Sequence, residues 1–315
     1  MVTLDTDLLQ EYRQRLAASV PAFVRPRRFV CAENWAKATS QGGTRYVGMF
    51  RENEPDLPTI LTQSQLLILG EPGAGKSTAA KAVAQHLLAK NDATVPILSP
   101  LKSYNGNLRA LLIQSVQPTI LDAPTVMRTY ILDGIDEVPT AHRDTLREDL
   151  RALVAADTRA RIVLTARQAY YAQHPNAFPD GCAAYHLIEF DDDDIRARAE
   201  HVGVDTDAFL HAAGEVDADE ELRNPFVLTV MLERYQEQGH LGRTRSENVD
   251  YAVQRLIQSR PQFNSFKQRR ALKMFAVACE TAARNDKSID RLQELAFQGN
   301  TPLDTWLNAI TYLQK

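Results

Sequence analysis

Three acidic side chains lie close together in the segment ILDGIDEV, residues 131–138. Asp133 ends an apolar run, and Asp136 and Glu137 come shortly after it. Carboxylates this close repel one another and are costly to bury without a partner. The segment therefore predicts that a positive charge, such as a metal ion or a lysine, binds among these acids.

A glycine-rich segment offers the complementary chemistry. GEPGAGKST, residues 70–78, fits the pattern G-x-x-x-x-G-K-[ST] of a phosphate-binding P-loop. It follows an apolar run and opens a stretch of good helix formers, which is the context this motif requires. The residues predicted to bind the nucleotide here are Gly70, Glu71, Pro72, Gly73, Ala74, Gly75, Lys76, Ser77 and Thr78.

The residue types in this loop suit phosphate binding. Glycines permit backbone angles and close approach that a side chain would block. Backbone N–H groups and the N-terminus of the following helix attract anions. We expect Lys76 to reach the β- and γ-phosphates and Ser77 to ligate Mg²⁺. The alternative, a glycine-rich turn with an incidental lysine, is disfavoured by this context.

The acids are expected to face this loop. In a parallel sheet, strand ends and helix starts gather at one edge, where ligands bind. Asp133 would then ligate Mg²⁺ together with Ser77. Asp136 or Glu137 would orient or deprotonate the water that attacks the γ-phosphate. We expect the stronger effect from Asp136, because it comes first after the turn; an acidic surface turn is the alternative.

Arg167 ends a further apolar run, RIVLTAR, at residues 161–167. An arginine at that point would sense the γ-phosphate or stabilise transition-state charge. A solvated arginine at the end of a strand explains the residue as well. Both interpretations stay open from the residues alone.

Apolar runs alternate with helix-forming stretches after residue 65. Strands are predicted at 66–70, 94–101, 129–134, 161–167 and 183–190. Helices are predicted at 77–90, 108–116 and 141–155, and before them at 7–20. This alternation predicts an α/β fold with a mainly parallel sheet covered by helices on both faces.

Beyond residue 190 the strand pattern ends and helices are predicted. The acidic run 191–194 suits a helix N-terminus. In the stretch 224–239, Asn224 is the expected N-cap, Pro225 the first helical residue and Gly239 the stop. A domain boundary near residue 190 follows.

Composition limits the classes of protein. A chain of 315 residues, with 44% hydrophobic and 24% charged residues, suggests about two domains. The formal net charge of −4 gives no indication of nucleic-acid or anionic-membrane binding. Three widely spaced cysteines argue against a disulfide framework or a zinc site. No apolar run is long enough for a membrane span, and no signal peptide is recognised, so we expect no membrane partner and a cytoplasmic location.

Four segments together resemble the NACHT group of STAND signalling NTPases: GEPGAGKST, ILDGIDEV, RIVLTARQ and RNPFVLTVMLERY. Residues 133–137 follow a pattern that separates this group from AAA+ proteins: an aspartate, a small residue, an apolar residue and two acids. The resemblance implies an N-terminal helical segment, a P-loop domain, a small helical domain and the start of a winged-helix domain. The corresponding ranges are 1–44, 45–190, 191–243 and 244–315.

The resemblance also implies roles for single residues. Arg167 corresponds to the arginine that senses the γ-phosphate. Pro225 corresponds to a proline that packs on adenine, although a helix-starting proline explains it equally well. Tyr46 and Val47, in the strand-like segment RYVGMF at 45–50, would line the base pocket.

Three functions are compatible with these observations. The first is a switch that binds ADP or ATP with Mg²⁺, hydrolyses ATP slowly and self-associates when ATP-bound; the resemblance implies a role for it in innate immunity, as in antiphage defence, or in other signalling. It would belong to a longer parent chain with sensor or effector domains, and nucleic acid is not indicated as its partner. The second is an AAA+-like ATPase that remodels or loads nucleic acid or protein. The third, a scaffold that only holds nucleotide, is disfavoured by the intact acids.

Overall fold

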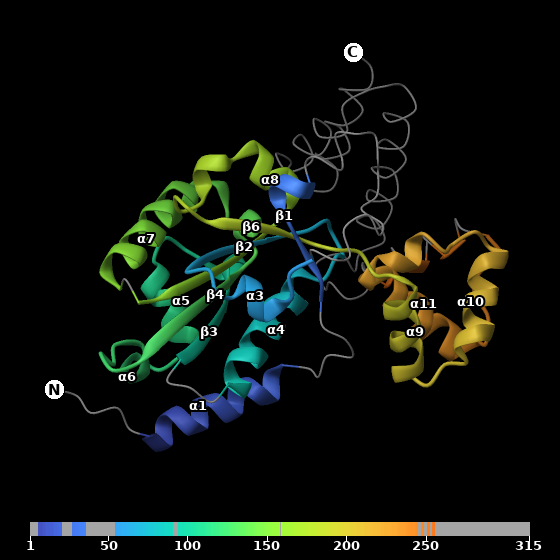
Figure 1. Cartoon of the computed structure of the whole chain (residues 1–315), viewed down its shortest axis with the longest axis horizontal. Coiled ribbons are helices and arrows are strands. Elements are labelled where there is room, and N and C mark those ends of the chain that lie inside the picture. Colours follow the sequence, from blue (N-terminus) through green and yellow to red (C-terminus); the bar gives the residue numbers. More distant parts are fainter. Residues whose placement is uncertain are drawn as a thin grey trace, which may run out of the picture. The chain divides into compact units, whose positions relative to one another are not determined.

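The computed structural model describes residues 6–20, 27–35, 54–90, 94–157, 159–244, 247–248, 251–252 and 254–255. The chain divides into two compact units, 1–240 and 241–315, and the sheet and its helices belong to the first (Figure 1). Tyr46, Val47 and nearly all of the expected winged-helix region lie outside the described residues. The four domain boundaries therefore stay a prediction.

The described residues contain a six-stranded, mainly parallel sheet. Its strands are β1 Phe29–Cys31, β2 Gln65–Leu69, β3 Thr94–Pro100, β4 Met127–Asp133, β5 Arg161–Ala166 and β6 Ala183–Leu187. Their order in the sheet is β1-β6-β2-β5-β4-β3, and every pair is parallel except β1 with β6. The prediction of a mainly parallel α/β fold is confirmed, and β5 lies between the two strands expected to carry the phosphate loop and the acids.

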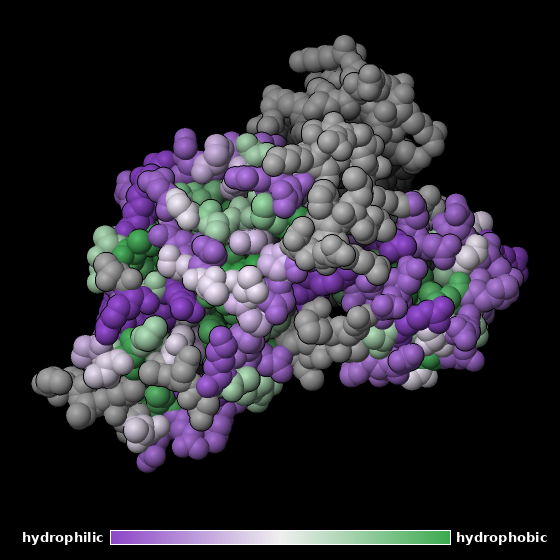
Figure 2. All heavy atoms as spheres, in the orientation of Figure 1, coloured by the Kyte–Doolittle hydropathy of each residue, from purple (hydrophilic) through white to green (hydrophobic). Residues whose placement is uncertain are grey.

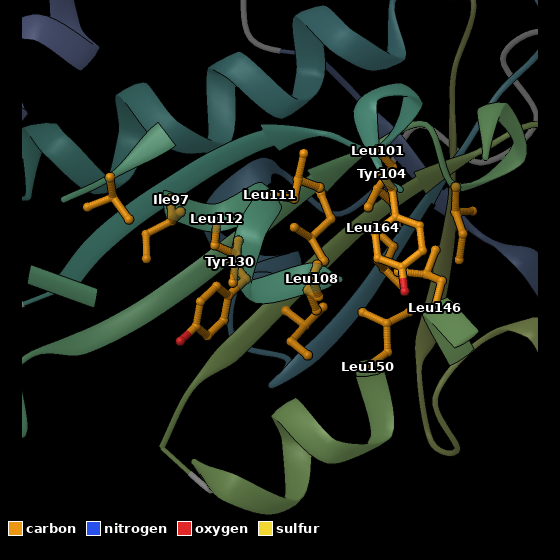
Figure 3. Packing of buried hydrophobic residues seen from close by; sticks show 14 of the residues in the cluster. Ile97, Leu101, Tyr104, Leu108, Leu111, Leu112, Tyr130, Leu146, Leu150 and Leu164 are labelled. Carbon is orange, nitrogen blue, oxygen red and sulfur yellow. The ribbon is translucent and has the colours of Figure 1, made fainter. Parts of the chain in front are cut away.

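Both faces of the sheet are buried, which explains why its strands are continuous apolar runs. Side chains alternate between faces along a strand, so Leu67 and Leu69 join one core cluster while Leu66 and Ile68 join another. The first cluster includes residues of α5 Leu108–Ser115 and α7 Arg143–Ala156, as Figure 3 shows. The second contains residues of α4 Lys76–Ala89 and α3 Leu57–Ile60.

Helix α1, Thr6–Ser19, lies at the edge strand β3. The hydroxyl of Tyr12 donates a hydrogen bond of 2.7 Å to the carbonyl oxygen of Pro96. Proline has no N–H to donate to a neighbouring strand, so it is tolerated in an edge strand, where no further strand pairs. Burial raises the pKa of Tyr12, so this hydroxyl stays protonated and keeps donating. Tyr12 thus anchors α1 to the sheet.

Several short elements were not expected from the sequence, among them β1 and α3. Strand β1 pairs antiparallel with β6, and α3 lies within residues 53–65, which we expected to be only a connection. The cap of α3 is local, because Asp56 accepts a 2.9 Å hydrogen bond from the backbone N–H of Thr59. Elements of three or four residues carry too little periodicity to be recognised. Conversely, β6 ends at Leu187, earlier than the predicted residue 190.

The helices after the sheet form a segment that we call the helical segment, residues 191–239, and Phe209 and Leu228 are among its buried residues. It contains α9 Asp192–His201, α10 Thr206–Glu215 and α11 Pro225–Gln238. Asp191 and Asp194 form a reciprocal capping box at the start of α9, as the acidic run suggested. The rings of Phe209 and Tyr235 meet edge to face at 5.5 Å and join α10 to α11.

Two further short helices in the described part of the chain are α6 Pro118–Leu121 and α8 Gln168–Gln173. Hydrophilic and hydrophobic residues are interspersed over the coloured surface in Figure 2, as expected for a folded domain. Among the described helices, none combines the length and the apolar character needed to cross a membrane.

Candidate functional site

The predicted phosphate loop connects β2 to α4. Gly73 and Gly75 have φ angles of +81° and +87°, a left-handed conformation that glycine adopts without strain. At Gly73 a side chain is also excluded by space, because an added Cβ would lie 2.6 Å from the Oδ1 atom of Asn224. The glycines are thus required by the loop as it is folded here.

The start of α4 presents unpaired donors. Its first intrahelical hydrogen bond runs from the N–H of Ala79 to the carbonyl of Gly75, at 2.8 Å. The N–H groups of Lys76, Ser77 and Thr78 therefore have no acceptor within the helix. Donors grouped at a helix N-terminus form a site that attracts anions. The loop fits a phosphate group by this criterion.

Lys76 folds back over the loop. Its Nζ donates hydrogen bonds to the carbonyl oxygens of Gly70, at 2.8 Å, and Glu71, at 3.1 Å. Burial lowers the pKa of Lys76, and the carboxylate of Asp136 acts in the opposite direction. Two carbonyl oxygens at the ammonium are ligands that phosphate oxygens can replace, since a charged acceptor binds an ammonium more strongly.

A buried threonine holds the end of β4. The hydroxyl of Thr165, on β5, donates to Oδ1 of Asp133 at 2.6 Å and accepts from the N–H of Gly134 at 2.7 Å. The second oxygen of Asp133 has no partner within the described residues, and Asp133 is partly exposed. The sequence did not lead us to expect this role for Thr165. A hydroxyl near the end of an otherwise apolar strand could have indicated it.

The other two acids have different surroundings. Asp136 accepts a hydrogen bond from the backbone N–H of Arg167 at 3.1 Å, and its Oδ2 lies 3.0 Å from Nε of the same arginine. Glu137 is exposed, and its carboxylate has no partner in the described part of the chain. Both carboxylate oxygens of Asp136 therefore contact Arg167, whereas the carboxylate of Glu137 is free to act on another molecule.

Helix α11 begins against the phosphate loop. The Nδ2 group of Asn224 donates to the carbonyl of Pro72 at 3.1 Å, and the N–H of Phe226 donates to the carbonyl of Gly73 at 3.3 Å. Pro225 lies between these residues, at the first position of the helix. The helical segment thus contacts the loop directly, through residues about 150 positions later in the sequence.

The expected site residues gather at one edge of the sheet. The phosphate loop follows β2, Asp133 ends β4 with Asp136 and Glu137 just beyond, and Arg167 follows β5. These are the carboxyl ends of parallel strands, where α/β proteins bind ligands. The hydroxyl of Ser77 and the carboxylate of Asp133 supply hard oxygen donors of the kind that Mg²⁺ prefers. The individual roles of all these residues stay predictions, and those of Tyr46 and Val47 fall outside the described residues.

Residues 66–160 match the viral superfamily 1 RNA helicase core domain family. The matched stretch runs from β2 to the turn before β5, and it contains both the phosphate loop and the three acids. The chain has a P-loop NTPase fold. The match covers less than half of the chain and supports no narrower family, so the resemblance to the NACHT group is not supported by it.

Solved structures show a distant similarity. The Orc1 protein of Aeropyrum pernix, in complex with DNA, shares 15% sequence identity over 96% of this chain and 86% of that chain, with a TM-score of 0.47. PCH-2 of C. elegans shares 14% identity over 81% of this chain and 71% of its own, with a TM-score of 0.36. At these values the similarity bears on no functional point. No curated protein matches the sequence.

One expectation about partners is wrong. The net charge led us to expect no indication of nucleic acid, but the family that matches residues 66–160 is an RNA helicase core domain. Net charge is a sum over the whole chain and does not report on local sites. Nucleic acid therefore has to be considered as a partner.

Proposed function

We propose that the protein is a Mg²⁺-dependent ATPase. The observation that carries this proposal is that β5 and the residue after it hold two of the three acids at the end of β4, Asp133 and Asp136. Thr165 holds Asp133 and Arg167 holds Asp136, beside a glycine loop with the geometry of an anion site. Phosphate transfer needs positioning and charge stabilisation more than covalent chemistry, and this arrangement offers both.

Each residue then has a defined task. Lys76 and the N–H groups at the start of α4 bind the phosphates. Ser77 and Asp133 hold Mg²⁺, which neutralises the charge that develops on the phosphate oxygens. Arg167, with its guanidinium partly exposed, reaches the γ-phosphate when it leaves Asp136.

Glu137 is the better candidate for orienting the attacking water. Our expectation from the sequence favoured Asp136, but both oxygens of Asp136 are engaged by Arg167. A general base needs an oxygen that can accept from water within hydrogen-bond distance. Only Glu137 of this pair has such oxygens free among the described residues. In this proposal Asp136 positions Arg167.

We propose further that hydrolysis acts on a nucleic acid or protein, as in AAA+-like ATPases. The match to an RNA helicase core domain supports nucleic acid as the first partner to test. Steady-state ATP hydrolysis is measured with and without single-stranded RNA and duplex DNA, using Lys76→Ala as the blank. Stimulation by either polymer is expected. Binding of ATP without hydrolysis under all conditions would overturn the ATPase assignment.

A signalling switch of the NACHT type is the second candidate. It is favoured by the spacing of Asp133, Asp136 and Glu137 and by the contact of α11 with the phosphate loop. In that case Pro225 packs on the base, ADP is retained, and ATP drives self-association. The expected location is cytoplasmic for both candidates, and the switch would serve innate immune or antiphage defence.

Two measurements separate the candidates. The purified protein is denatured and its supernatant analysed for ADP by ion exchange, and its mass is followed by light scattering with and without ATP. A switch carries ADP, turns over slowly and grows in mass with ATP. A nucleotide-free preparation with fast turnover stimulated by nucleic acid excludes the switch.

A further inference from the structure

Three consecutive carbonyl groups of the phosphate loop are held from outside the loop. The carbonyl of Pro72 accepts from Nδ2 of Asn224 at 3.1 Å. The carbonyl of Gly73 accepts from the N–H of Phe226 at 3.3 Å. The carbonyl of Ala74 accepts from Nη2 of Arg27, also at 3.1 Å. Two distant parts of the chain thus hold one short stretch of backbone.

These contacts orient the N–H groups of the loop. A trans peptide unit is planar, so its C=O and N–H point in opposite directions. Donors that hold the carbonyls of Pro72 and Ala74 on the outside turn the N–H groups of Gly73 and Gly75 the other way. Neither N–H has an acceptor within the described residues, whereas the N–H of Ala74 donates to Glu71.

Arg27 is itself held rigidly. Its Nη2 also donates to the carbonyl of Ile188 at 2.8 Å, and its guanidinium lies 4.6 Å from the centre of the Phe190 ring. Burial lowers the pKa of Arg27 to about 10, so the side chain stays charged at neutral pH. A planar, charged donor stacked on an aromatic ring is well suited to hold a backbone carbonyl.

Asn224 serves two purposes with one side chain. Its Oδ1 caps α11 by accepting from the N–H groups of Phe226 and Val227, and its Nδ2 holds Pro72. The helix N-terminus and the loop therefore move together. A ligand that needs the loop amides in this orientation also stabilises the docked α11, since linkage is reciprocal.

We propose that Arg27 and Asn224 are positioning residues that pre-organise the phosphate-binding amides and couple bound phosphate to the docking of α11. The inference rests on the proposed nucleotide binding and adds to it two residues that do not contact the nucleotide. Pre-organised donors lower the free-energy cost of ordering the site when the ligand binds. Losing either contact should weaken binding of any ligand held through its phosphates.

The test uses two variants, each of which removes the side-chain donor to one carbonyl of the loop. Asn224→Ser retains a good N-cap but loses the amide donor, and Arg27→Met retains the apolar stem. Displacement of a fluorescent ADP analogue gives affinities for ADP and for inorganic pyrophosphate. Each variant should bind both ligands about 3- to 10-fold more weakly, the range expected for one hydrogen bond lost from the phosphate loop. The factor should be equal for the two ligands, because the affected groups face phosphate.

Matched controls separate positioning from general destabilisation. Asn107→Ser alters an N-cap on α5, and Arg109→Met removes an exposed arginine that pairs with Asp122. Both should bind ADP like the wild type. ADP should also slow hydrogen exchange at the start of α11 in the wild type, and less so in Asn224→Ser.

The outcomes decide between distinct claims. Wild-type affinity in both variants would overturn the inference and leave the ATPase proposal intact. Weaker binding of ADP with unchanged pyrophosphate binding would also overturn it, because the residues would then act on the base. A wild-type protein that binds neither ADP nor ATP would remove the proposed function itself.

Discussion

Arg167 and Asp136 form a two-point contact between the end of β5 and the turn after β4. The backbone N–H and Nε of the arginine bind different oxygens of the same carboxylate, at 3.1 and 3.0 Å. The Asp136 side chain is 7% exposed, while that of Arg167 is 44% exposed. The contact thus keeps a buried carboxylate compensated and leaves the arginine within reach of a ligand.

Glu137→Gln should reduce the rate of ATP hydrolysis by about 100-fold or more and change ATP affinity little. General base catalysis contributes on the order of 10²–10⁴-fold, and only the transition state needs the oriented water. Single-turnover hydrolysis and equilibrium binding of ATP measure the two quantities. Unchanged turnover would exclude Glu137 as the base.

Asp136→Asn should act mainly through Arg167. The amide keeps an oxygen for the backbone N–H of Arg167 but loses the negative charge beside its Nε. We expect a smaller loss of turnover than in Glu137→Gln and a change in the preference for ATP over ADP. Affinities for both nucleotides test this. A larger loss of turnover than in Glu137→Gln would return the role of base to Asp136.

Lys76→Ala should abolish detectable nucleotide binding and leave the fold intact. Within the described part of the chain, the ammonium donates its hydrogen bonds to two loop carbonyls, and it contributes little to the core. Calorimetric titration with ADP and ATP gives the affinity, and the melting curve reports on the fold. Lys90→Ala, at the other end of α4, is the matched control and should bind normally. Near wild-type affinity in Lys76→Ala would refute the P-loop assignment.

Thr165→Val should destabilise the fold by about 1–3 kcal/mol, because the N–H of Gly134 loses its buried acceptor. The substitution should also make ADP binding depend less on Mg²⁺, because Asp133 loses the hydroxyl that orients it. Urea unfolding and Mg²⁺ titration of ADP binding are the measurements. Thr129→Val is the control: this buried hydroxyl has no partner among the described residues, so its loss should be neutral or stabilising. Equal effects at both positions would contradict the role assigned to Thr165.

Protonation of His186 should destabilise the folded state. The side chain is 2% exposed and stacks on Trp35 at 4.6 Å. Burial lowers the pKa of His186 to about 4, below the 6.5 of an unfolded histidine. The unfolded state then binds more protons between these values, so stability is fully present above pH 6.5 and declines as the pH falls toward 4.

A variant separates the contribution of His186 to the pH dependence of stability from the contributions of the acidic residues. His186→Phe keeps an aromatic ring against Trp35 and cannot be protonated. Its free energy of unfolding, from urea titrations at several pH values, should decline less than that of the wild type between pH 6.5 and 4. Parallel curves for the two proteins would show that His186 does not titrate in this range.

Local patterns in the sequence were sufficient for the five parallel strands, the glycine loop and the acidic turn. The alternation of apolar strands and helices, and the spacing that leads to Lys76 and Asp133, are properties of short stretches of chain. Burial of both faces of a parallel sheet imposes the first, and phosphate geometry imposes the second. The strands expected at 66–70, 94–101, 129–134, 161–167 and 183–190 and the helices expected at 7–20, 77–90, 108–116 and 141–155 were therefore confirmed, with bounds that moved by a few residues.

Contacts between distant segments were decided only by the tertiary structure. Strand order places β5 beside β4. Thr165 therefore contacts Asp133, and Arg167 contacts Asp136. Asn224 reaches Pro72 across 152 positions and Arg27 reaches Ala74 across 47. Such pairings depend on how elements pack against one another, because burial and hydrogen bonding act between neighbours in space. A local pattern of residues along the chain does not indicate which distant residues become neighbours in the folded protein.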